Sequence, residues 1–218
     1  MKKLLALLLA TAMLLSMTAC CLPMDQLKDD VLGMIPTQPS FSMGTTDGLN
    51  YESEFIGIGC DLERGWSFAT EDEIRELNNI VEDVLDEDLA VALENADVVY
   101  DMMATSLDQT HNIIVTLEKV NPIQLATLDI AKNYEVVYSS MEQSFEDMGY
   151  KNIMHKVDTI TVDGKELDAL VITADVYGMN IYQTTFCIKC NGYLASVCVT
   201  SVGINTNAKL LDTFYWVD

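Results

Sequence analysis

Two dipeptides in the last third of the chain restrict how its strands can pair. Asp163-Gly164 and Asn191-Gly192 each stand between runs of alternating apolar and polar residues. Asp-Gly and Asn-Gly in this position favour the two-residue turns of β-hairpins. A third tight connection is expected at residues 178–180. The sequence therefore predicts an antiparallel meander of four strands, at residues 151–162, 166–176, 181–190 and 193–202.

Helical signals lie before this strand-rich region. Thr70 and Glu73 form a capping box, which predicts a helix that begins at Glu71. Apolar spacing predicts a second helical stretch over 88–94, and Pro122 predicts the start of a long helix. That helix is expected to end near residue 148, and its buried positions are predicted to be Leu128, Ala131, Tyr134, Tyr138, Met141, Phe145 and Met148.

The remaining elements complete the predicted fold class. Alternating residues predict strands at 54–62, 98–105 and 112–120, and a closing helix is expected at 207–214. A contiguous run of strands with helices before and after it favours an α+β fold. We therefore expect an antiparallel sheet flanked by helices, an α/β/α sandwich.

The N-terminus has the pattern of an export signal. Lys2 and Lys3 precede an apolar run at residues 4–15, which is too short to span a bilayer. The residues that follow, Met17-Thr18-Ala19-Cys20, resemble the lipobox of bacterial lipoproteins. This resemblance implies cleavage between Ala19 and Cys20 and a diacylglycerol on the Cys20 sulfur, so residues 1–19 are a predicted lipoprotein signal peptide.

The anchor and the composition set the expected domain organisation. Residues 20–50 are rich in Pro, Gly and Ser and are predicted to be a flexible tether, with a short helix at 24–34 as the alternative. Residues 51–218 are expected to form a single domain. A lipid with two or three acyl chains holds a protein stably on a membrane. The predicted location is therefore the extracytoplasmic face of the cell membrane.

The order of elements resembles a known fold family. A strand, a turn with Gly65-Trp66, a capped helix, two strands and a long helix precede a meander that contains Asp163-Gly164-Lys165, Tyr182-Gln183 and Asn191-Gly192-Tyr193. This order resembles the PsbP-like (Mog/PsbP) α/β/α fold, and it is similar to uncharacterised lipoproteins of that fold from Gram-positive gut bacteria. The resemblance implies an accessory or binding role, and none of the family's functional residues maps onto a matching motif here.

The charge of the chain argues against one class of partner. The sequence has 34 acidic and 12 basic residues, a net charge of −22. Removal of residues 1–19 takes away two lysines and gives −24. Nucleic-acid binding requires clustered Lys and Arg, so it is not expected. A strongly acidic surface attracts cations and basic partners.

The cysteines of the folded part do not indicate a redox or zinc site. Cys187 and Cys190 are three residues apart in a predicted strand, about 10 Å, on opposite faces, which excludes a disulfide between them. Cys187 and Cys198 are predicted to lie diagonally on one face, either as buried thiols or as a strained bridge. Cys60 carries no pairing prediction. No metal site and no cofactor are predicted.

Three further groups of residues have two interpretations each. His111 and His155 stand alone in the sequence and are expected to be solvated or packed rather than catalytic. The aromatic residues near both ends of the domain either line a groove or close the core, namely Trp66, Phe68, Tyr215 and Trp216. One acidic run is either the solvated face of a helix or a calcium site without EF-hand spacing, namely Glu82, Asp83, Asp86, Glu87 and Asp88.

These observations give three function hypotheses. The first is a non-enzymatic surface lipoprotein that binds a partner in the envelope or outside it. The second is a carrier of a small molecule or a cation such as Ca²⁺, with a pocket near Trp66 and the sheet edge or with calcium at the acidic run. The third is an enzyme that brings His111 or His155 close to Cys187, Cys198 or paired carboxylates. The first is our expectation, and no catalytic residue is predicted.

The lipobox interpretation predicts how the chain partitions in cells. Cys20→Ser removes the sulfur that would carry the lipid, so the variant is expected to leave the membrane fraction for the soluble extracytoplasmic fraction. Fractionation and immunoblotting measure this change. Cys21→Ser is the matched control and is expected to stay with the membrane. Retention of the Cys20→Ser variant in the membrane fraction would contradict lipidation at Cys20.

Overall fold

The computed structural model describes residues 41–78, 93, 96 and 98–217. The signal peptide with Ala19 and Cys20 lies outside these residues, as do the acidic run and all of the predicted helical stretch 88–94 except Leu93. The predictions made for those segments stay predictions.

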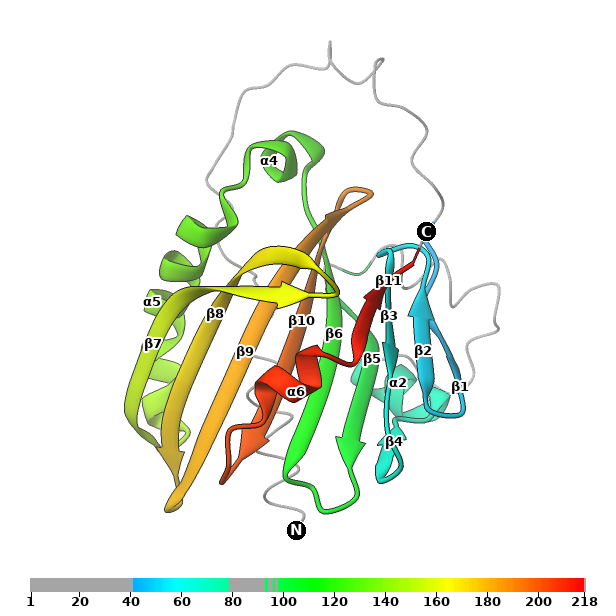
Figure 1. Cartoon of the computed structure of the whole chain (residues 1–218). Helices are drawn as coiled ribbons and strands as arrows, with labels where there is room; N and C mark the ends of the chain where they lie inside the picture. The colour runs from blue at the N-terminus through cyan, green and yellow to red at the C-terminus, as the bar shows by residue number, and fades with distance from the viewer. Residues whose placement is uncertain (1–40, 79–92, 94–95, 97, 218) are drawn as a thin grey trace.

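A large antiparallel sheet forms the middle layer of the molecule (Figure 1). Its strand order is β4-β5-β6-β10-β9-β8-β7. The predicted meander is confirmed as β7 to β10, and the two strands predicted before the long helix are confirmed as the neighbours β5 and β6. The bounds are Trp66–Phe68 (β4), Val98–Ser106 (β5), His111–Lys119 (β6), Tyr150–Val162 (β7), Lys165–Val176 (β8), Met179–Cys190 (β9) and Tyr193–Val202 (β10).

The central strand β10 shows that both faces of this sheet are covered. All ten of its residues are buried. Ala195, Val197 and Val199 belong to the hydrophobic cluster on one face. Leu194 and Cys198 belong to the cluster on the other. Because successive side chains of a strand point to opposite faces, the sheet separates two cores.

Helices α4 and α5 cover one face. The predicted single helix is interrupted: α4 spans Pro122–Thr127 and α5 spans Ile130–Asp147. The break occurs because Leu128 is extended and the Asp129 side chain accepts a hydrogen bond from the Lys132 amide, which caps a new helix. Four residues of α5 that were predicted to be buried are buried, namely Tyr134, Tyr138, Met141 and Phe145. Val137, which was not predicted, is buried as well.

A second, smaller sheet covers part of the opposite face, together with the short helix α6 (Asn207–Leu211). Its order is β1-β2-β3-β11. Its strands are Thr45–Asp47, Asn50–Ser53, Ile58–Asp61 and Phe214–Trp216. The predicted α+β class with antiparallel pairing is confirmed. The layer expected to be helical on this face is mainly sheet.

Three predicted boundaries differ from the structure. The strand predicted at 54–62 is a turn followed by β3, because Phe55 and Ile56 are both buried and the chain reverses at Gly57. The predicted closing helix ends at Leu211, and β11 then pairs with β3. Residues 41–50, assigned to the tether in the sequence prediction, form β1 and begin β2, and Phe41 and Met43 pack against the core.

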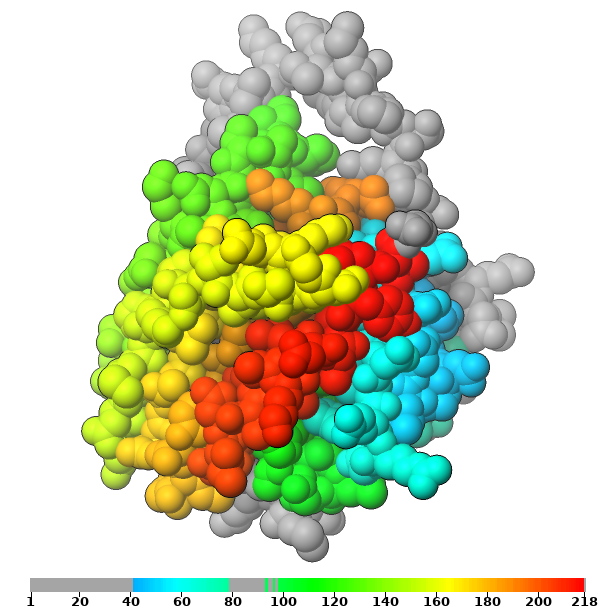
Figure 2. Space-filling view, in the orientation of Figure 1, coloured from blue at the N-terminus to red at the C-terminus, as the bar shows by residue number. Residues whose placement is uncertain are grey.

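The hairpin of β7 and β8 bends over the small sheet and fixes the C-terminus. In Figures 1 and 2 its tip meets the red C-terminal segment. The Trp216 indole nitrogen donates to the Val162 carbonyl at 3.0 Å. The Lys165 ammonium lies 3.8 Å from the centre of the Trp216 ring. Trp216 therefore packs against the core and the tip of the β7–β8 hairpin. This agrees with the interpretation that the aromatic residues close the core.

Removal of a buried ring from α5 tests the helical core. Phe145 is fully buried and its ring centre lies 5.2 Å from that of Tyr150. Phe145→Ala is expected to lower the free energy of unfolding by about 3–5 kcal/mol. Urea denaturation of the mature chain measures the change.

Val136→Ala on the same helix is the matched control. Val136 is 48% exposed, so its truncation is expected to change the free energy of unfolding by no more than about 0.5 kcal/mol. Equal losses in the two variants would contradict the packing of α5 on the sheet.

Candidate functional site

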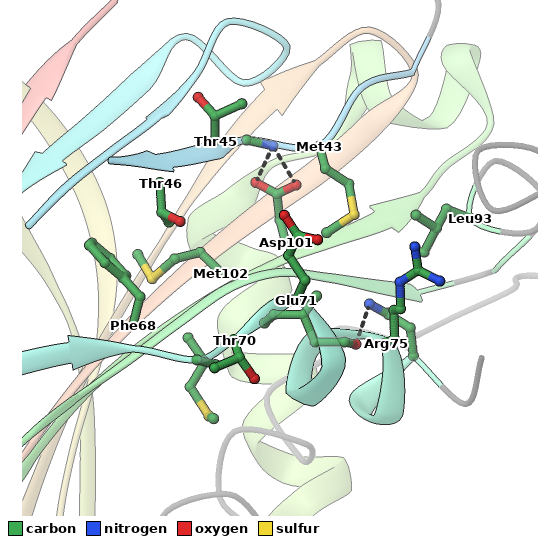
Figure 3. Close-up of a pocket in the computed structure, with 15 residues that line it drawn as sticks. Met43, Thr45, Thr46, Phe68, Thr70, Glu71, Arg75, Leu93, Asp101 and Met102 are labelled. Carbon is green, nitrogen blue, oxygen red and sulfur yellow. Dashed lines mark hydrogen bonds between the residues drawn. The ribbon is translucent and has the colours of Figure 1, made fainter. Parts of the chain in front are cut away.

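A cavity of about 620 Å³ opens beside strand β4, between the small sheet, strand β5 and helix α2 (Glu71–Leu77) (Figure 3). Its volume lies within the range of about 300–1,000 Å³ that is usual for small-molecule sites. Its apolar lining consists of Met43, Phe68, Ala69, Ile74, Leu93, Met102 and Met103. Its polar lining includes Thr45, Thr46, Thr70, Glu71, Arg75 and Asp101.

A β-bulge places Asp101 in this cavity. Tyr100 lies opposite Thr116 and Met102 lies opposite Val115, so Asp101 has no residue opposite it on β6. A bulge inserts an extra residue into one strand and changes the direction of its side chains. Asp101 and Met102 both line the cavity and Asp101 is only 5% exposed.

The Asp101 carboxylate is held by the N-terminal part of the fold. The Gly44 amide donates to its two oxygens at 3.0 and 3.2 Å. The Tyr51 hydroxyl donates a short hydrogen bond to Oδ2. A Cβ atom on residue 44 would overlap the Tyr51 ring and lie 2.9 Å from Asp101 Oδ2, so only glycine allows this approach. We call residues 41–47 the strap, because they hold one side of the cavity through this contact.

Burial dominates the electrostatics of this contact. It raises the pKa of Asp101, and the hydrogen bonds from Tyr51 and Gly44 oppose this rise. Burial raises the pKa of Tyr51 well above its ordinary value, and the neighbouring Asp101 charge raises it further. A buried acid with a shifted pKa in a cavity marks a candidate functional site.

Helix α2 lies at the rim of the cavity, and side-chain hydrogen bonds define both of its ends. The predicted capping box is confirmed: the Glu73 amide donates to Thr70 Oγ1, and Glu73 Oε2 accepts from the Thr70 amide. At the other end, Asn78 Nδ2 donates to the Tyr100 carbonyl at 3.0 Å and Asn78 Oδ1 accepts from the Tyr100 amide at 2.8 Å. The Asn78 side chain thus pairs with the edge of β5 next to the bulge.

The cavity combines an apolar interior with few polar groups, a composition that is common in small-molecule sites. In Figure 3 the Asp101 carboxyl group points toward the segment that carries Met43 and Thr45, and Arg75 extends beside Leu93. Apolar walls supply binding energy, while a small number of placed polar groups orient a ligand. The Asp101 carboxylate is an acceptor for a donor or cation that enters the cavity.

The structure places the four cysteines of the domain as buried free thiols. Cys187 lies opposite Ser196, as the predicted turn requires, and its thiol is 3.3 Å from the Ser196 hydroxyl. Burial raises the pKa of Cys187 to about 11 and that of Cys190 to about 12. Thiols of this kind are weak nucleophiles at neutral pH. Of the two alternatives for Cys187 and Cys198, the free thiols are the observed state.

The two histidines lie apart from the cavity and from these thiols. His111 Nε2 is 2.8 Å from Thr206 Oγ1 and its Nδ1 is 2.7 Å from Thr110 Oγ1. The His155 ring stacks on Tyr138 with centres 3.5 Å apart, and its Nε2 is 3.3 Å from Glu135 Oε2. The two histidines thus contact hydroxyl groups, aromatic rings and single carboxylates.

The predicted aromatic group is split by the fold. Phe68 lines the cavity, whereas Trp66 lies near His111, with ring centres 6.1 Å apart. Tyr215 lies opposite Gly59 in the small sheet, and its hydroxyl donates a hydrogen bond to Glu52 Oε1. Within the described ranges, no cluster of three or more His, Cys, Asp or Glu residues is arranged to hold a metal ion. The helices of those ranges include none that is long and apolar enough to cross a membrane.

Sequence reasoning did not find the centre of this site. Gly44, Tyr51 and Asp101 were not among its candidate residues. One signal was available, because Asp101 is a charged residue in the middle of the otherwise apolar run at residues 98–104. A carboxylate in a buried strand requires partners, and those partners come from distant parts of the sequence.

Comparisons with known proteins do not assign a family. No family model matches the chain, and no curated protein matches it. Among solved structures, LpqN of Mycobacterium tuberculosis, described as involved in cell envelope biogenesis, aligns over 72% of this chain and 76% of its own with 11% identity and a TM-score of 0.38. A protein of Bacteroides thetaiotaomicron aligns over 79% of this chain and 50% of its own with 8% identity and a TM-score of 0.40. The function of the site is therefore inferred from its own residues.

The buried carboxylate predicts a pH dependence of stability with a definite sign. The pKa of Asp101 is raised above its ordinary value of 3.8 in the folded state. In the interval between the two values the folded state binds more protons than the unfolded state, so the Asp101 contribution to stability falls as pH rises. Asn does not titrate. The unfolding free energy of the wild type minus that of Asp101→Asn is expected to decrease as pH rises above about 4, measured by urea denaturation.

Asp158→Asn is a control with the opposite sign. Asp158 is on the surface, and its hydrogen bond from Lys156 lowers its pKa. A lowered carboxyl pKa adds stability above the ordinary value, so the corresponding difference for Asp158 is expected to increase as pH rises from acid. A difference for Asp101→Asn that is flat or increases with pH would contradict a raised pKa at Asp101.

Proposed function

We propose that this chain is a non-enzymatic, lipid-anchored binding protein on the extracytoplasmic face of the cell membrane, and that it binds a small ligand in the cavity beside β4. The observation that carries the proposal is the nearly buried Asp101 carboxylate in a cavity of about 620 Å³ whose other walls are largely apolar. Of the three hypotheses from the sequence, the carrier hypothesis predicted a pocket near Trp66 and the sheet edge, or calcium at the acidic run. The cavity lies beside β4, the strand that contains Trp66, and Phe68 of that strand lines it.

The composition of the walls supports ligand binding. Met43, Met102 and Met103 contribute flexible thioether side chains, and Phe68 contributes an aromatic ring. Methionine adapts its shape to different apolar partners, which is why it is frequent in binding surfaces of broad specificity. Such walls suit an apolar ligand body better than a strongly polar one.

The predicted anchor supports the proposed location. A lipid on Cys20 would hold the chain at the membrane, and residues 20–40 would connect it to the strap at residue 41. The strap lines the cavity through Met43 and Gly44. The proposed binding site would therefore begin close to the point where the anchored segment joins the domain.

The contacts of the histidines support a role without catalysis. The enzyme hypothesis required His111 or His155 beside a thiol or beside paired carboxylates. His111 instead contacts Thr110 and Thr206, and His155 contacts Tyr138 and Glu135. We assign neither histidine a part in the proposed function.

A screen of small molecules tests ligand binding. The protein is the full mature chain with Cys20→Ser, so that no lipid occupies the cavity. Compounds with an apolar body and one or two polar groups are expected to raise the melting temperature. Phe68→Ala removes an apolar wall of the cavity and is expected to weaken their binding about tenfold or more, measured by calorimetry.

Leu107→Ala is the matched control for the wall variant. Leu107 is 75% exposed and is not part of the cavity lining, so its truncation is expected to leave the affinities unchanged. The proposal fails if no compound raises the melting temperature, or if Phe68→Ala and Leu107→Ala bind the compounds equally well.

A further inference from the structure

The charge at the centre of the cavity has two neutral hydrogen-bond partners. The Gly44 amide and the Tyr51 hydroxyl donate to Asp101, and neither carries a positive charge. Among the described residues, Asp101 Oδ1 accepts a hydrogen bond from the Gly44 amide, which also donates to Oδ2, whereas Oδ2 accepts a second one from the Tyr51 hydroxyl. A carboxylate oxygen accepts more than one hydrogen bond, so Oδ1 of this lining residue retains acceptor capacity beyond the contacts of the described residues.

The other charged residues of the lining offset one another. Glu71 and Arg75 are four positions apart on α2, on the same side of the helix, and have opposite charges. Their combined charge is zero. The net charge of the cavity lining is therefore that of Asp101.

The walls near Asp101 are suited to a cation on an apolar body. Aromatic faces attract ammonium groups, and Phe68 is one of the lining residues. The thioethers of Met102 and Met103 add polarisable apolar surface. The net charge of −22 over the whole chain raises the local concentration of cations and repels anions.

We propose that the cavity selects ligands that carry a protonated amine on an apolar body, with the ammonium group bound to Asp101 Oδ1 and the body against Phe68, Met102 and Met103. This assignment rests on the proposed function, because it names the class of ligand for the same site. The ammonium group supplies the opposite charge that Gly44 and Tyr51 do not, and a charge-assisted hydrogen bond is about twice as strong as a neutral one.

Three probes with the same apolar body test the assignment. They are 2-phenylethylamine, 2-phenylethanol and 3-phenylpropionate, which present an ammonium, a hydroxyl and a carboxylate group at neutral pH. Calorimetry with the mature Cys20→Ser chain is carried out in about 0.15 M salt, which screens the surface charge. The amine is expected to bind at one site per chain, about tenfold to a hundredfold more tightly than the alcohol, with the carboxylate weakest.

Two variants separate the cavity from the acidic surface. Asp101→Asn keeps the shape of the side chain and removes its charge, so the preference for the amine over the alcohol is expected to fall at least tenfold while alcohol binding stays within about threefold. Asp158→Asn removes one charge from the surface and is expected to leave the preference unchanged. Methyl NMR of the methionines gives a second readout on the wild-type cavity, in which the amine is expected to shift the Met102 and Met103 signals.

The possible results decide between this inference and the proposed function. The inference is overturned if the amine does not bind, if the alcohol binds as tightly as the amine, or if Asp101→Asn keeps the preference. If the alcohol or the carboxylate binds and Phe68→Ala weakens that binding, the proposed function stands and only the ligand class fails. If none of the three binds and the compound screen also finds no ligand, both fail.

Discussion

The burial of β10 on both faces is the constraint on which the rest of the fold depends. All ten residues of this strand are buried, and it lies between β6 and β9 in the middle of the large sheet. A strand that is apolar on both faces is stable only when both faces are covered. Helix α5 covers one face and the small sheet with α6 covers the other. The two cores, and the layers that form them, follow from this one strand.

The candidate site lies where the small sheet meets the β4–β5 edge of the large sheet. Among the described residues, only Trp66–Phe68 continues the sheet beyond β5, and the Asn78 side chain pairs with another part of the β5 edge. The bulge next to Asn78 directs Asp101 toward the small sheet, where Tyr51 reaches it. Burial of a carboxylate costs free energy unless it is hydrogen-bonded, and the strap supplies the second partner through Gly44. The cavity at this junction has walls from the strap, the large sheet and helix α2.

The sequence allowed prediction of the elements with local signals and not of those set by tertiary contacts. The turns at Asp163-Gly164 and Asn191-Gly192 and the capping box of α2 were predictable, because neighbouring residues determine their conformation. The turn before β3 was not predictable in this way. Phe55 and Ile56 are adjacent and both buried, which breaks the alternation of a strand and depends on the surrounding core. The centre of the site was not predicted because its bulge is a mismatch between two strands, and its partners Gly44 and Tyr51 are more than forty residues away in sequence.

The strap links the proposed ligand to the stability of the N-terminal edge of the domain. Gly44 and Tyr51 hold the same carboxylate that an incoming ammonium group would contact. A ligand that binds only when this contact is formed stabilises the strap, because anything that binds the folded state alone shifts the folding equilibrium toward it. The strap directly follows residues 20–40, which would connect it to the lipid. Occupancy of the cavity and order at the membrane-proximal end of the domain are therefore coupled through Asp101 in the proposed function.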